Sequence, residues 1–106
     1  MNIQDIDQIL IITADRNSIS AADDMYGHKN EFEFDSKTSL REIIEIIEKH
    51  KEYSNYGGAA WAGNNSNYKC IRNNKGQWLV NQTESASKFF EKIDTYIRFE
   101  RNSNKC

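Results

Sequence analysis

The chain of 106 residues contains no proline, only two cysteines and only two histidines. The absence of proline excludes proline kinks and proline-rich linkers. No apolar run approaches the ~20 residues that a helix needs to cross a bilayer. No basic residue precedes the first apolar run, so a signal peptide is not expected either. These features predict a cytoplasmic protein without a membrane partner.

The few cysteines and histidines also limit the chemistry. Cys106 is the last residue of the chain and is expected to be frayed, so we expect no structural disulfide between Cys70 and Cys106. No H-E-x-x-H, paired C-x-x-C or G-x-S-x-G motif is present, and Gly57-Gly58 does not lead into a helix. The sequence therefore predicts a protein that is not an enzyme, with no catalytic residues, no cofactor and no metal.

The residues that are present argue for a folded chain. Hydrophobic residues make up 38% of the sequence, charged residues 28% and aromatic residues 11%. This composition supplies enough apolar surface to form one modest core. We predict a single domain over residues 1–106, with flexible ends at 1–7 and 102–106.

The clearest element is a helix at residues 39–53, SLREIIEIIEKHKEY. Its apolar residues follow one face of a 3.6-residue period, and Ser39 with Glu42 forms an S-x-x-E capping box. Those apolar residues are Leu40, Ile43, Ile44 and Ile47. With only one apolar face, this helix is expected to pack against a sheet.

Strand patterns flank this helix. Residues 9–13 form an unbroken apolar run, typical of a central strand buried on both faces. Residues 31–35, EFEFD, alternate strictly between acidic and aromatic side chains. Further strands are predicted at 59–62, 68–72 and 77–80, with a turn at 73–76, and a second helix runs from Thr83 past Ile97. The order β-β-α-β-β-β-α predicts an α+β fold: a mostly antiparallel sheet of about five strands with two helices on one face.

Charge is distributed unevenly along the chain. Residues 1–36 carry eight acidic and two basic side chains, whereas the remainder carries an excess of four positive charges. A long loop at 15–30 precedes the acidic strand, and long loops in compact domains are usually functional. An acidic patch suits a basic protein partner, with Tyr26 as an aromatic anchor. The predicted partner-binding residues are Asp23, Asp24, Tyr26, His28, Glu31, Glu33 and Asp35.

Two other kinds of site remain as alternatives. Asp23, Asp24 and His28 could serve a small metal-binding or ligand-binding domain, or an enzyme, built on the 15–30 loop. Basic residues interleave with aromatic ones at 68–78, a pattern that single-stranded nucleic acid binding uses. The acidic pI of 5.7 argues against nucleic acid as a partner.

Two short segments resemble parts of a known class of proteins. Residues 18–24, SISAADD, followed by His28, and residues 57–61, GGAAW, resemble segments of bacterial immunity proteins from polymorphic and contact-dependent growth-inhibition toxin systems. The resemblance implies a small cytoplasmic protein that binds one cognate toxin C-terminal domain, often a basic nuclease. It also implies that binding covers the active site or substrate groove of the toxin.

Overall fold

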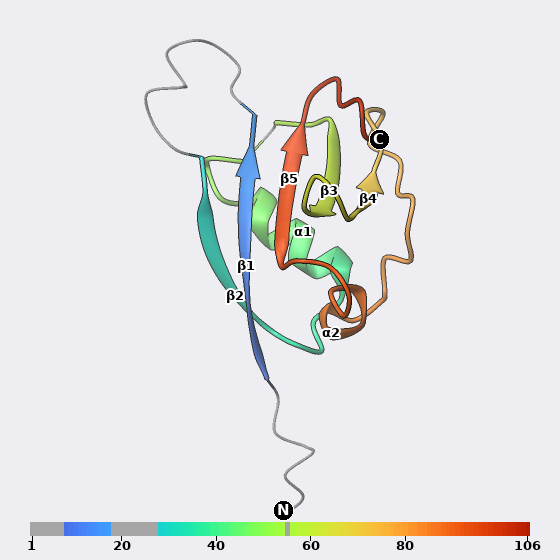
Figure 1. Cartoon of the computed structure of the whole chain (residues 1–106). Helices are drawn as coiled ribbons and strands as arrows, with labels where there is room; N and C mark the ends of the chain where they lie inside the picture. The colour runs from blue at the N-terminus through green and yellow to red at the C-terminus, as the bar shows by residue number, and fades with distance from the viewer. Residues whose placement is uncertain (1–7, 18–27, 55) are drawn as a thin grey trace, which may run out of the picture.

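A computed structural model describes residues 8–17, 28–54 and 56–106 and shows an α+β fold (Figure 1). One five-stranded sheet has the order β2-β1-β5-β3-β4, and two helices accompany it. The strands are β1 (Ile9–Arg16), β2 (Asn30–Asp35), β3 (Ala59–Gly63), β4 (Tyr68–Arg72) and β5 (Tyr96–Glu100), and the helices are α1 (Leu40–Glu48) and α2 (Ala86–Phe89). The β1–β5 pair is parallel and the other pairs are antiparallel. The predicted fold class is confirmed.

Helix α1 begins where the capping box predicts. The backbone N–H of Glu42 donates to the Ser39 side chain over 3.2 Å. This bond satisfies one free donor of the first turn. The four predicted apolar residues of its stripe are all buried.

The helix ends at Glu48 rather than continuing to Tyr53, and the following turns bury Tyr53 beneath the sheet. Its hydroxyl there donates to the backbone oxygens of Ala14 and His28. No helix in the described ranges is long and apolar enough to span a membrane.

Both helices cover the same face of the sheet. Every second strand residue points to this side, and these side chains join those of the helices in one hydrophobic cluster. The strand residues of the cluster are Ile12, Ala14, Phe34, Ala60, Ala62, Ile71, Ile97 and Phe99. In Figure 1 helix α1 passes behind β1 and β5, and α2 lies beside the end of α1. The opposite face of the sheet has no helix over it among the described residues.

The order of the last elements corrects the sequence prediction. The observed order is β-β-α-β-β-α-β, because residues 96–100 form strand β5 instead of continuing the second helix. Helix α2 is only four residues long. Ile97 and Phe99 are buried while Tyr96, Arg98 and Glu100 face the other side, which is the period of a strand. Pairing with β1 and β3 on both sides outweighs the helical spacing of the preceding apolar residues.

The segment at 77–80 is also different from the prediction. The turn forms as expected, with the N–H of Gly76 donating to the oxygen of Asn73. After it the chain makes one isolated bridge between Trp78 and Arg72, together with a bond from the N–H of Leu79 to the oxygen of Ile71. This return is therefore too short to be a strand.

Strand β1 lies between β2 and β5, so its predicted interior position is confirmed. The prediction that both of its faces are buried is wrong. Ile9 is 61% exposed and Ile11 is 49% exposed, because the helices cover only the other face. The unbroken apolar run thus supplies Ile12 to the core and two isoleucines to the surface.

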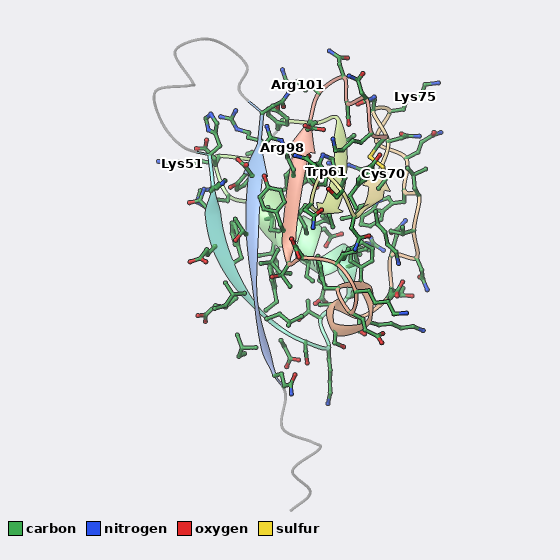
Figure 2. All side chains as sticks on the ribbon, viewed as in Figure 1. Lys51, Trp61, Cys70, Lys75, Arg98 and Arg101 are labelled. Carbon is green, nitrogen blue, oxygen red and sulfur yellow. A yellow bond between two sulfur atoms is a disulfide. The ribbon has the colours of Figure 1, made fainter. Side chains whose placement is uncertain are left out.

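The cysteines correct a further prediction. Cys70 on β4 and Cys106 form a disulfide with their Cα atoms 5.8 Å apart (Figure 2). The tail is held as well: the N–H of Ser103 donates to the Asn74 side chain, and the Ser103 hydroxyl donates to Glu100. Residues 102–106, predicted to be a flexible end, cross from β5 back to β4.

Candidate functional site

The sheet face away from the helices, called here the open face, is the candidate site. It carries the strand residues that alternate with the core residues. Strand by strand they are Glu31, Glu33 and Asp35 of β2, Ile9, Ile11, Thr13 and Asp15 of β1, Tyr96, Arg98 and Glu100 of β5, Ala59, Trp61 and Gly63 of β3, and Tyr68 and Cys70 of β4.

The β2 side of the open face is acidic and apolar. Register pairs Glu33 with Ile11 and Asp35 with Ile9, so the carboxylates lie beside two exposed isoleucines. Glu31, Glu33 and Asp35 make no ion pair in the part of the chain that the structure describes. We call these five side chains, Ile9, Ile11, Glu31, Glu33 and Asp35, the acidic strip. Exposed isoleucines next to unpaired carboxylates make a surface that can bind a partner with apolar and basic groups.

The predicted partner-binding residues separate into three groups. Glu31, Glu33 and Asp35 come together on the acidic strip, as the alternation in the sequence predicts. Asp23, Asp24 and Tyr26 lie outside the described residues. His28 is 8% exposed, and its Nδ1 contacts the carboxylate of Glu52. His28 is therefore not part of the acidic strip.

A hollow of about 520 Å³ lies on the other half of the open face, where β5 and β3 run side by side. Figure 2 labels Arg98 and Trp61 on these neighbouring strands. The lining of the hollow combines aromatic, basic, acidic and amide side chains: Lys29, Trp61, Asn64, Asn65, Asp94, Tyr96, Arg98 and Glu100, together with Gly63.

A network of hydrogen bonds fixes the floor of the hollow. The Arg98 guanidinium donates through Nη1 to Asp15 at 2.9 Å and through Nε to Glu100 at 3.1 Å. The Tyr96 hydroxyl donates to Asp15 at 2.5 Å, and the Trp61 indole N–H donates to Glu100 at 2.8 Å. Asp15 is only 6% exposed. Arg98 and Tyr96 both bind its carboxylate there.

Two groups of this network, Tyr96 and Arg98, have raised pKa values. Burial raises the pKa of Tyr96 to about 12, and its hydrogen bond to Asp15 adds to the shift. Burial lowers the pKa of Arg98, but Tyr96, Asp15 and Glu100 together raise it above the usual value. Tyr96 and Arg98 therefore keep their protons, and this pair is suited to holding a structure rather than to exchanging protons.

The tail adds a further layer next to the hollow. Lys105 lies over the rings of Trp61 and Tyr68, with its ammonium nitrogen 5.2 and 5.4 Å from their centroids. The neighbouring Cys70–Cys106 disulfide holds this residue in place. The tail thereby covers the β3–β4 side of the open face and leaves the acidic strip uncovered.

The two alternative sites lie only partly within the described residues, because Asp23 and Asp24 of the 15–30 loop are not among them. No group of three or more His, Cys, Asp or Glu side chains could hold a metal ion within the described ranges. At the 68–78 hairpin two of the three cations are engaged by neighbouring side chains, and Lys75 is exposed at the turn. Arg72 forms two bonds of 3.1 Å with Glu48, and Lys69 lies over the Phe89 ring. This hairpin does not present a row of free basic groups.

The hollow was missed by sequence reasoning because residues 96–100 were placed in a helix. The signal was present as the alternation Y-I-R-F-E, which puts Tyr96, Arg98 and Glu100 on one face of a strand. Asp15 has no such signal, because its partners are distant in sequence.

Comparison of the chain with protein-family models, with curated proteins and with solved structures finds no match.

Proposed function

We propose that this chain is a protein-binding module that neutralises a bacterial toxin domain, and that the toxin docks on the open face at the acidic strip. The observation that carries this proposal is the juxtaposition on β1 and β2 of exposed isoleucines and unpaired carboxylates. Interfaces commonly combine an apolar centre with a charged surround that selects the partner. Ile9 and Ile11, at 61% and 49% exposure, provide the apolar part.

Charge defines the kind of partner. The three carboxylates of the acidic strip favour a basic surface and speed its approach, an effect that added salt reduces. The resemblance of residues 18–24 and 57–61 to immunity proteins supports a toxin C-terminal domain, such as a basic nuclease, as that surface. Inhibition in this proposal is by coverage of the toxin's active site or substrate groove, not by catalysis.

The proposed place of action is the cytoplasm, where a toxin would meet its target. Thiols are kept reduced there, so the Cys70–Cys106 bond would be open in that compartment. The acidic strip lies at the opposite edge of the sheet from β4, which carries Cys70. We therefore expect toxin binding to be the same for oxidised and reduced protein.

The test is co-purification and growth rescue. The tagged chain is co-expressed with the product of the adjacent upstream gene in its native genome, and both the complex and cell survival are measured. The variant Glu31→Lys/Glu33→Lys reverses two charges on the acidic strip. The matched control Glu45→Lys/Glu91→Lys makes the same charge change at exposed positions away from the open face.

We expect the strip variant to lose both the complex and the rescue, while the control keeps both. Circular dichroism and urea unfolding establish that each variant is folded. Rescue by the strip variant at the wild-type level would show that the acidic strip is not the binding surface.

A further inference from the structure

We propose that the free edge of β2 accepts a β-strand of the protein partner, and that this strand alternates basic and apolar residues. The inference rests on the proposed function and deepens it, because it states which backbone groups bind the partner and which sequence pattern the partner must have. The carboxylates of the acidic strip select the incoming strand, while the unpaired backbone of β2 binds it.

The direction of the β2 backbone groups follows from two hydrogen bonds at the ends of the ladder. The N–H of Ser36 donates to the oxygen of Gln8, which is in register with the β1–β2 pairs. In an antiparallel pair, bonded and non-bonded residue pairs alternate. Phe34 and Phe32 therefore exchange bonds with β1, whereas Glu33 and Glu31 point their N–H and C=O groups away from it. The N–H of Thr13, opposite Glu31, indeed donates to Thr95 at the start of β5.

The outward groups of Glu31 and Glu33 have no partner among the described residues. The oxygen of Asp35 accepts the N–H of Thr38 in a turn, but the N–H and C=O groups of Glu31 and Glu33 bind nothing in the described ranges. They recur every second residue, at a spacing of about 6.8 Å, which matches the repeat of another antiparallel strand. This edge offers four consecutive groups for ladder hydrogen bonds.

Edge strands are commonly protected by proline, by charged side chains, especially lysine, or by a bulge. β2 has acidic side chains but neither the proline nor the bulge that would block its backbone. Residues 30–35 contain neither proline nor lysine, and their register with β1 is continuous. The other edge of the sheet differs, because Trp78 and the N–H of Leu79 bind the outer side of β4. β2 is therefore the edge that remains open among the described strands (Figure 1).

The side chains disfavour a second copy of this chain as the occupant in the register that pairs the two β2 strands along their full length. An antiparallel copy that uses the outward groups pairs Glu33 with Glu33 and Glu31 with Asp35. Like charges directly opposite one another are destabilising in a sheet, whereas opposite charges stabilise it. The edge therefore favours lysine or arginine at the positions opposite these acids.

The opposite face of the incoming strand meets different surroundings. Phe32 is only partly buried at the edge of the core, and it points to the helix side of the sheet. An incoming apolar side chain would cover it. Basic residues toward the open face and apolar residues toward the helix side give the alternating pattern of the proposed strand.

A synthetic peptide tests the edge directly. The full-length protein is titrated with a nine-residue peptide that alternates lysine and valine, and amide hydrogen exchange is followed by NMR. We expect the amides of Glu31 and Glu33 to exchange at least about 10-fold more slowly at saturation. We expect a glutamate–valine peptide, or the lysine peptide with N-methylated lysine amides, not to bind. Binding without slowed exchange at Glu31 and Glu33, or equal binding by the N-methylated peptide, would overturn the proposal.

A pair of variants at Glu33 distinguishes the contribution of its backbone N–H to peptide binding from the contribution of its side-chain charge. Glu33→Thr removes the charge and keeps the N–H, whereas Glu33→Pro also removes the N–H, which does not bond to β1. Proline is tolerated in an edge strand where its nitrogen faces outward. We expect the proline variant to bind the lysine–valine peptide at least about 10-fold more weakly than the threonine variant. Equal affinities of the two variants would show that the β2 edge does not bind the peptide through its backbone. If Glu33→Pro does not fold, the comparison of the lysine–valine peptide with its N-methylated form tests the same point.

The same variants distinguish this inference from the proposed function. If the toxin binds Glu33→Pro as well as Glu33→Thr but does not bind Glu31→Lys/Glu33→Lys, the open face binds without strand addition and the inference is wrong. If no toxin is bound or neutralised while the peptide protects the two amides, the inference holds and the proposed function fails.

Discussion

Removal of the Cys70–Cys106 disulfide gives the sharpest test of the fold. The bond joins residues 36 positions apart in the sequence. In the chain-entropy treatment, cross-linking a loop of this length removes about 13 cal/mol/K from the unfolded state. At 25 °C the double variant Cys70→Ser/Cys106→Ser should therefore lose about 3.8 kcal/mol of unfolding free energy.

The assay is urea unfolding of the wild type and the double variant under air, followed by circular dichroism. With a denaturant slope of about 1–3 kcal/mol/M for a chain of this size, the midpoint should fall by at least about 1 M. A reductant should lower the wild-type midpoint to that of the double variant and leave the double variant unchanged. Each single serine variant should behave like the double variant, because either one abolishes the bond.

Mass spectrometry after alkylation provides the control for bond formation. Wild-type protein purified under air should show no alkylated cysteine, and reduced protein should show two. Two reactive thiols in the folded, air-oxidised protein would refute the pairing. A midpoint difference under about 0.2 M despite a formed bond would refute the entropic argument.

Two further predictions concern the core and the hollow. Ile47 is fully buried, whereas its neighbour Ile46 is 44% exposed. Ile47→Ala should therefore lower the unfolding free energy by about 2–5 kcal/mol, and Ile46→Ala should cost less than about 1 kcal/mol. Equal urea midpoints for these neighbouring variants would show that the helix is oriented differently. Tyr96 releases its proton near pH 10 in the unfolded chain, and burial raises its folded pKa to about 12. The stability that its ionisation behaviour contributes to the folded state is therefore complete below pH 10 and is lost as the pH rises toward 12. Between pH 9 and 11.5, Tyr96→Phe should lose less unfolding free energy than the wild type does. Urea midpoints that change in parallel for the two proteins across that range would contradict the raised pKa of Tyr96.

Local sequence patterns predicted the elements that depend on residues close together in the sequence. The helix at 39–53 was recognised from its capping box and its apolar period, and its start at Leu40 is confirmed. Strand β2 was recognised from strict alternation, and its acidic residues do share one exposed face. These features depend on residues two to four positions apart, which a sequence displays directly.

Long-range pairing explains what was missed. Ile97 continues a helical spacing begun at Ala86, which competes with the two-residue alternation of residues 96–100. Pairing with β1 and β3 makes these residues a strand. The Cys70–Cys106 bond depends on the path of the tail back to β4, which no local pattern encodes. The hollow was missed for the same reason, since Asp15 and Arg98 meet only when β1 and β5 pair.

The central place of β5 has a consequence for how the protein is made. β1 pairs with β2, and β3 pairs with β4, but neither hairpin pairs with the other. Residues 96–100 bridge them, with a parallel ladder on one side and an antiparallel ladder on the other. During translation the two hairpins must wait until residues 96–100 have left the ribosome before one sheet can close. A nascent chain stalled before residue 96 would expose the facing edges of β1 and β3 and would depend on chaperones to avoid aggregation.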